Sequence, residues 1–269
     1  MYYIFRATTR QLLQRMRAVG AIGVTFLALL AAPLAALAAP PFAAEPSLTL
    51  YSPVAGINMP STPAGPEDVL DKLRRGFALT YEDNNRTAAE LKWFAKHPDY
   101  LNRVFTRAQR YLPYILAELE RRDMPLELAL LPIVESAYDP FAYSHGRAAG
   151  LWQMIPGTAK RFGIKQNWWY DGRRDVVDST RAALDYLEYL EELNDGNWLN
   201  AIASYNSGEG NVLRAARNNR KAGKSIDFWY LKLPKETSMY VPKLLALVEI
   251  VADPAKYNLT LPVVPNEQQ

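Results

Sequence analysis

Glu135 is the clearest candidate for acid–base chemistry, because it follows an unbroken apolar run at residues 128–134. Residues 126–138 predict one strongly apolar helix, with Glu127 near its start, where a carboxylate suits the helix dipole. Glu135 should therefore be at least partly buried, which raises a carboxyl pKa because the charged form loses hydration. A carboxyl group that stays protonated near neutral pH can act as a general acid. A purely structural role, with Glu135 paired to an arginine or a hydroxyl, fits this helix equally well.

A second carboxylate, Asp139, lies four residues after Glu135 and could share its helical face. Two facing carboxylates would indicate ordinary glycoside hydrolysis. Asp139 directly precedes Pro140, however, and the residue before proline disfavours helical geometry. We therefore expect Asp139 just past the helix end, where its side chain would bond to a turn.

The segments after Glu135 have the composition of a sugar-binding groove. Residues 148–150 are Ala-Ala-Gly, which allow close backbone approach, and Trp152 and Gln153 follow with an aromatic face and an amide. Residues 204–208 read Ser-Tyr-Asn-Ser-Gly, a polar run with glycine at a predicted helix end. Sugar polymers present hydroxyls for hydrogen bonds and apolar ring faces for aromatic stacking. Trp152 by itself is better explained as a core residue.

Composition excludes several other chemistries. The 269 residues contain no cysteine and two histidines, which excludes disulfides, thiol nucleophiles, cysteine-bound metal clusters and lipid-modified cysteine. We expect no metal and no cofactor. The net charge of +3 comes from four arginines in residues 1–38, and residues 39–269 hold 27 basic against 28 acidic side chains. Nothing in that balance predicts nucleic-acid binding.

The N-terminal 66 residues are predicted to be a leader and a linker. Residues 1–17 are positively charged, residues 18–37 are an uncharged and mainly apolar run, and residues 36–38 fit a cleavage site. This pattern predicts a signal peptide over residues 1–38, or an uncleaved N-terminal membrane anchor. Residues 39–66 contain seven prolines and predict an extended tether.

The elements that must position these residues are helices. Apolar residues recur at helical spacing from residue 67 onward, and alternating β-branched runs are almost absent. Pro98 and Pro156 fit helix starts, Pro113 fits a break, and Thr87 with Glu90 fits a capping box. We expect an all-α fold with one domain over residues 67–255 and a short C-terminal tail over residues 256–269.

Together these residues resemble the lytic transglycosylases of bacterial cell walls, and within that family most strongly the membrane-bound D-type enzymes. A further segment at residues 170–175 also fits the family. The likeness runs from about residue 70 to residue 255, with a core at about residues 120–220. It rests on four blocks in order: Glu135-Ser136; Gly150-Leu151-Trp152-Gln153; Ser204-Tyr205-Asn206; and Glu236-Thr237-Ser238-Met239-Tyr240-Val241-Pro242-Lys243.

The resemblance implies a lysozyme-like catalytic domain preceded by N-terminal helices. By position, Glu135 matches the catalytic acid and base, Ser144 matches a substrate-contacting serine, and Gln153 belongs to the block that lines the cleft. Tyr205 and Asn206 match the block that binds glycan and braces the catalytic glutamate, and Tyr240 matches a tyrosine near its carboxyl. Trp168, Trp169 and Tyr170 could supply a stacking face or could simply pack in their loop.

The activity implied is non-hydrolytic cleavage of the β-1,4 bond between N-acetylmuramic acid and N-acetylglucosamine, leaving 1,6-anhydro ends. Glycan strands of peptidoglycan are then the partner, and other envelope partners remain open. One alternative is a hydrolytic muramidase on the same scaffold, with Asp139 or Asp175 activating water. The other is a non-catalytic peptidoglycan-binding envelope protein.

Two departures from the family pattern concern residue type and attachment. Ser204 stands where alanine is usual, a small change. D-type relatives often carry a lipid-modified N-terminal cysteine and wall-binding repeats after the catalytic domain, whereas this sequence has no cysteine and ends at Gln269. We therefore expect export to the periplasm or cell envelope without a lipoprotein anchor, and wall affinity from the catalytic domain, the leader or a partner.

Overall fold

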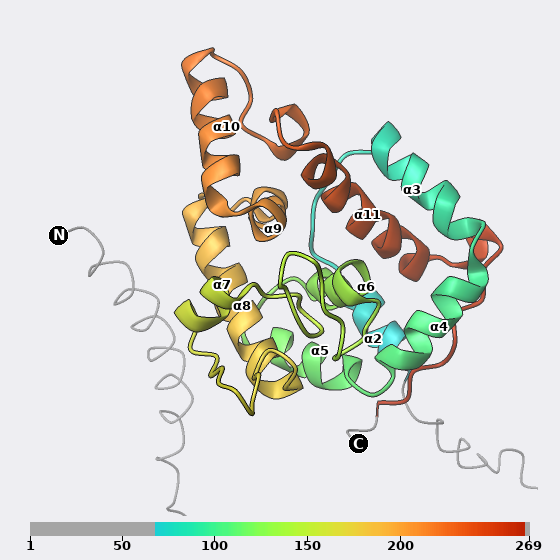
Figure 1. Ribbon diagram of the computed structural model, residues 1–269. Helices are drawn as coiled ribbons and strands as arrows, with labels where there is room; N and C mark the ends of the chain where they lie inside the picture. Colours follow the sequence, from blue (N-terminus) through green and yellow to red (C-terminus); the bar gives the residue numbers. More distant parts are fainter. Residues whose placement is uncertain (1–67, 267–269) are drawn as a thin grey trace, which may run out of the picture. The chain divides into compact units, whose positions relative to one another are not determined.

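The computed structural model describes residues 68–266, which form helices joined by loops with no named strand in that range (Figure 1). The predicted all-α fold is confirmed for this part of the chain. The predicted leader and the whole of the proline-rich linker lie outside the described residues. The α-helices are α2 (Val69–Arg75), α3 (Asn85–Ala95), α4 (Pro98–Ala108), α5 (Leu112–Arg121), α6 (Leu131–Ser136), α7 (Pro156–Arg161), α8 (Val176–Leu193), α9 (Trp198–Ser207), α10 (Glu209–Lys221) and α11 (Lys235–Ala252).

Helix α11 is the central helix of the domain. It buries apolar side chains around most of its circumference and packs against α3 and α9, as expected for a helix enclosed by others. Pro242 lies inside it and lacks the N–H that would serve the carbonyl of Ser238. Arg86 of α3 supplies the missing donor, with Nη1 3.2 Å from the Ser238 oxygen. This contact ties α3 to the half of α11 that carries Tyr240.

Proline and polar caps set the helix starts largely as the sequence predicts. Pro98, Pro113 and Pro156 each lie in the first turn of a helix, where a missing N–H costs nothing. The predicted capping box at Thr87 is wrong. The side chain of Asn84 accepts from the N–H of Arg86 at 3.0 Å, so α3 begins earlier than Thr87 indicated.

The apolar segment 126–138 is divided rather than a single helix. A 3₁₀ helix, η1 (Leu126–Leu130), leads into α6, whose first turn contains Pro132. Helix α6 ends at Ser136 because Ala137 and Tyr138 both adopt left-handed backbone angles, with φ of 51° and 59°. Glu135 therefore lies in the last turn of a short helix, beside a sharp change of chain direction.

Glu127 has a different role from the one its sequence position indicated. Its side chain is fully buried, and Oε1 accepts from the backbone N–H groups of Ala78 and Leu79, each at 2.7 Å. Burial raises the pKa of Glu127, and these hydrogen bonds act in the opposite direction. Glu127 fastens the segment after α2 to η1, which is a structural task rather than a dipole effect.

The last described residues return to the start of the domain. The N–H of Val69 donates to the Val264 carbonyl at 2.8 Å, and the N–H of Val264 donates to Asp68 Oδ1 at 3.0 Å. The side chain of Val264 is buried with Val69 in the main core. The residues after α11 thus secure α2, which packs against both α11 and α5.

Candidate active site

Helix α6 and the turn after it hold Glu135 in place. Tyr138 is buried, and its hydroxyl donates to the Ala129 carbonyl at 2.6 Å. Ser136 Oγ donates to the carbonyl of Leu151 at 2.9 Å, which joins the end of α6 to the following loop. These bonds fix Ser136 and Tyr138, which closely follow Glu135, so its carboxyl group projects from a rigid base.

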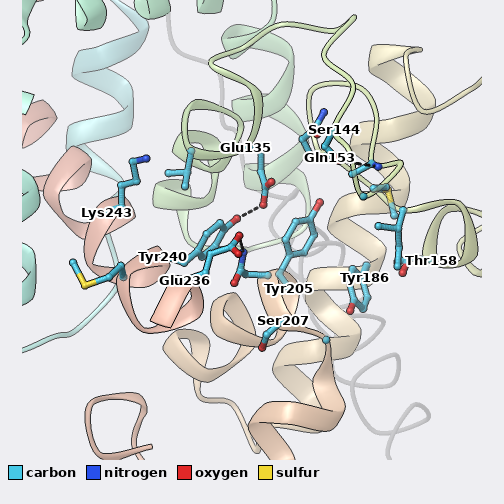
Figure 2. Close-up of a pocket in the computed structure, with 18 of the residues that line it drawn as sticks. Glu135, Ser144, Gln153, Thr158, Tyr186, Tyr205, Ser207, Glu236, Tyr240 and Lys243 are labelled. Atoms are coloured by element: carbon cyan, nitrogen blue, oxygen red, sulfur yellow. Dashed lines mark hydrogen bonds between the residues drawn. The ribbon is translucent and has the colours of Figure 1, made fainter. Parts of the chain in front are cut away.

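Glu135 faces a cleft of about 1010 Å³ (Figure 2). The cleft is lined from α6, the loop at residues 142–155, the end of α9 and the first half of α11. Its lining includes every site residue that the sequence indicated: Glu135, Ser144, Gln153, Tyr205, Asn206 and Tyr240. Residues separated by more than a hundred positions in the sequence are thus brought to one cavity.

Tyr240 is the direct partner of Glu135, and its hydroxyl donates to Glu135 Oε1 (Figure 2). Burial raises the pKa of Glu135 to about 7, the hydrogen bond from Tyr240 lowers it, and the negative charge of Glu236 raises it further. A carboxyl group with this pKa exists in both protonation states near neutral pH. It can therefore donate a proton and later accept one.

Tyr205 and Asn206 line the same cleft as Glu135 but bond to other groups. The Tyr205 hydroxyl donates to the Trp152 carbonyl at 2.7 Å, and Asn206 Nδ2 lies 3.5 Å from Glu236 Oε1. Burial and the negative charge of Glu135 raise the pKa of both Tyr205 and Tyr240 well above the usual tyrosine value, so both phenols stay neutral. The resemblance assigned the bracing of Glu135 to the Tyr205 block, whereas its hydrogen bond here comes from Tyr240.

Ser144 and Gln153 both hold the loop that forms one wall of the cleft. Ser144 Oγ accepts from the N–H of Ala148 at 3.1 Å. Gln153 Nε2 donates to the carbonyls of Ala142 and Gly150, at 3.1 and 2.9 Å. The amide nitrogen of Gln153 is therefore occupied within the protein, and its clearest role is to shape this wall.

Gly150 and Arg173 lock the same wall to the loop before α8. Gly150 has φ of +82°, and a Cβ built there would lie 1.8 Å from the Arg173 carbonyl oxygen. Only glycine fits such an approach. The buried Arg173 guanidinium pairs with Asp171 at 2.7 Å and donates to the carbonyls of Arg147 and Met154 at 2.6 and 3.1 Å.

Neither aspartate considered as a second catalytic carboxylate lines the cleft. Asp139 Oδ1 accepts from the N–H of Phe141 at 2.9 Å, which confirms the predicted turn. Asp175 Oδ1 accepts from the N–H of Asp178 at 2.9 Å and caps α8. Trp152 is fully buried and donates to Thr180 Oγ1 at 2.9 Å, so the prediction that it belongs to the core is confirmed.

Sequence reasoning did not select several residues that line the cleft. Glu236 and Lys243 lie on α11 at spacings of four and three from Tyr240, so one helical face presents all three. That spacing was a usable signal. Tyr186 also lines the cleft, and its hydroxyl donates to Glu209 Oε2 at 3.2 Å. No local pattern distinguishes Tyr186 from an ordinary core tyrosine of α8.

Two negative findings apply to residues 68–266. Within this range no cluster of three or more histidine, cysteine, aspartate or glutamate side chains is arranged to hold a metal ion. Across the same residues, no helix has both the length and the apolar character needed to cross a membrane.

The fold and the cleft define a class of protein. Residues 113–228 match the family model described as "Transglycosylase SLT domain". The chain therefore belongs to the lytic transglycosylase family, as its sequence motifs predicted. Helices α2, α3 and α4 lie before the matched region, as expected.

Relatives of known name are similar over the same region. Membrane-bound lytic murein transglycosylase D of Escherichia coli K12 is 46% identical over 192 residues, which cover 71% of this chain and 42% of that protein. An Alteromonas protein named for tributyltin chloride resistance is 49% identical over 50% of this chain and 67% of its own length. Membrane-bound lytic murein transglycosylase C of Glaesserella parasuis is 37% identical over 46% of this chain and 37% of its own length. The chain thus spans less than half the length of each of the two named transglycosylases.

Proposed function

We propose that this protein cleaves the MurNAc-β-1,4-GlcNAc bond of peptidoglycan without water and leaves 1,6-anhydro-MurNAc ends, with Glu135 as acid and then base. The observation that carries the proposal is the Glu135 carboxyl itself. It faces a cleft of about 1010 Å³, a volume that can hold sugar rings, and burial raises its pKa to about 7. The match to the transglycosylase domain family and the similarity to named murein transglycosylases support the same reaction.

Glu135 would act twice in this reaction. Its protonated form donates to the glycosidic oxygen while positive charge develops at the anomeric carbon of the muramyl ring. The resulting carboxylate then takes the proton from the muramyl 6-hydroxyl, whose oxygen closes onto that carbon. Atoms balance without water, and Glu135 ends protonated as it began. A single carboxyl group is enough, because the nucleophile comes from the substrate.

Tyr240 would tune Glu135 during this cycle. Its hydroxyl donates to Glu135 Oε1 and stabilises the carboxylate that forms after the first proton transfer. Burial opposes the same charge and keeps the acid form available near neutral pH. Ser144, Gln153, Tyr205 and Asn206 would position the glycan or the cleft walls that hold it.

A hydrolytic muramidase is the second candidate function, and the position of Glu236 in the cleft supports it. Glu236 is an exposed carboxylate that lines the same cleft, so it could activate water where Asp139 and Asp175 cannot. Digestion of purified sacculi in H₂¹⁸O separates the reactions. Anhydro ends without ¹⁸O support transglycosylation, ¹⁸O-labelled reducing ends support hydrolysis, and binding without products supports a non-catalytic wall protein.

The proposed setting is the cell envelope, where peptidoglycan is found. Two of the relatives, from Escherichia coli and Glaesserella parasuis, are described as membrane-bound lytic murein transglycosylases. For this chain, the basic and apolar pattern of residues 1–38 supports export, with the leader cleaved or kept as an anchor. Sequencing the N-terminus of the protein recovered from envelope fractions decides between these two outcomes.

A further inference from the structure

The loop between α7 and α8 exposes two neighbouring tryptophans. Trp168 is 87% and Trp169 is 90% exposed, and Tyr170 beside them is 41% exposed. Neither indole makes a ring contact with another residue of the described range. Packing within the loop, one of the two roles left open by the sequence, therefore does not account for them. Adjacent exposed aromatics of this size usually mark a binding surface.

Hydrogen bonds within this loop hold its backbone in a defined turn. Asn167 Oδ1 accepts from the N–H groups of Trp169 and Tyr170, each at 2.9 Å. The N–H of Asn167 donates to the Tyr170 carbonyl at 2.8 Å, and the loop closes at its base through a bridge between Gln166 and Asp171. The tryptophans are thus displayed by a preorganised turn, which lowers the entropy lost when a ligand binds.

A hollow of about 440 Å³ lies among these aromatic residues, and charged side chains complete its lining. Asp171, Arg174 and Asp175 line it together with Asn167, Trp168, Trp169 and Tyr170. Aromatic faces beside carboxylate and guanidinium groups suit a pyranose ring, which has apolar faces and a rim of hydroxyls. Two carboxylates in the lining make an anionic lipid surface a poor match.

We propose that Trp168, Trp169 and Tyr170, here called the tryptophan platform, form an accessory binding site for the sugar rings of a glycan strand. The inference rests on the proposed function, because a peptidoglycan strand is the polymer that would reach both surfaces. The structural basis of the proposal is Arg173, which joins the platform loop to the cleft wall. Arg173 pairs with Asp171 in the platform loop and donates to Arg147 and Met154 in the cleft wall, so the two surfaces form one rigid unit.

The test uses the full chain carrying Glu135→Gln, so that glycan is bound without turnover. In that background, the double substitution Trp168→Ala and Trp169→Ala is compared with Tyr230→Ala, which removes an exposed aromatic from another loop. The probes are purified sacculi and a soluble hexamer of β-1,4-linked N-acetylglucosamine. We expect roughly fivefold or greater weakening on both probes for the double variant, and no change for Tyr230→Ala.

Rescue and competing ligands make the result decisive. The double substitution Trp168→Phe and Trp169→Phe should keep most of the affinity, because the aromatic faces remain. Unchanged affinity of the double alanine variant overturns the proposal. So does an effect confined to binding of phosphatidylglycerol vesicles, or to self-association measured by sedimentation. If the active wild type released no anhydro ends while the platform still bound the hexamer, the proposed reaction would fail and the glycan site would stand.

Discussion

The substitution Glu135→Gln should change how the stability of the protein depends on pH. Because burial raises the pKa of Glu135 from 4.5 to about 7, the native protein holds this proton more tightly than the unfolded chain does. Between these two values the unfolded chain releases the proton first, so native stability falls as pH rises. Glutamine does not titrate, and the variant should escape this loss.

The size of the effect follows from the same pKa. A rise from 4.5 to about 7 corresponds to about 3 kcal/mol when the group is fully ionised in both states. Most of this loss develops between pH 5 and pH 8, so the variant should gain about 2 to 3 kcal/mol over wild type across that interval. For a domain of this size that gain corresponds to roughly 5 to 10 °C in melting temperature.

The assay is calorimetric unfolding of wild type and Glu135→Gln at pH 5 and pH 8. Glu192→Gln is the matched control, because it makes the same chemical substitution at an exposed position of α8. The control should follow wild type within about 0.5 kcal/mol at both pH values. If the stability of Glu135→Gln changed between pH 5 and pH 8 by as much as that of wild type, burial would not be what holds the Glu135 carboxyl protonated.

Three further substitutions test the parts around Glu135. Tyr240→Phe removes a hydrogen bond that lowers the Glu135 pKa, so the alkaline limb of the pH–activity profile should move to higher pH; no movement or a shift to lower pH would contradict this. Gly150→Ala forces a Cβ against the Arg173 carbonyl and should cost roughly 2 to 4 kcal/mol of unfolding free energy in urea titrations. An Ala variant as stable as wild type would show that the two loops do not meet closely. Arg173→Met leaves Asp171 without its partner and should lower stability by about 3 to 5 kcal/mol, whereas a loss below about 1 kcal/mol would exclude a structural role for the link.

Local sequence patterns predicted the helices and the burial of the Glu135 carboxyl, because both depend on neighbouring side chains. Glu135 is recognisable as a carboxylate that follows apolar residues, and Pro98 and Pro156 mark helix starts by their missing donors. Asp139 is recognisable as a turn residue because Pro140 follows it. In each case the deciding interaction lies within a few positions of the residue.

The features that sequence could not supply depend on contacts between distant segments. Glu127 looked like a helix-start carboxylate until the backbone of Ala78 and Leu79 was seen to bind it. Tyr240 lies 105 positions from Glu135, and only family resemblance could pair them before the structure did. The end of α6 at Ser136 was also hidden, since left-handed angles at Ala137 and Tyr138 are not what their residue types favour.

The most direct test of the central claim is mass spectrometry of the products that wild type and Glu135→Gln release from purified sacculi. We expect wild type to release 1,6-anhydro-muropeptides and the correctly folded variant to release none, while it still binds the sacculi. Release of anhydro-muropeptides by Glu135→Gln at the wild-type rate would contradict the assignment of Glu135 as the catalytic acid and base.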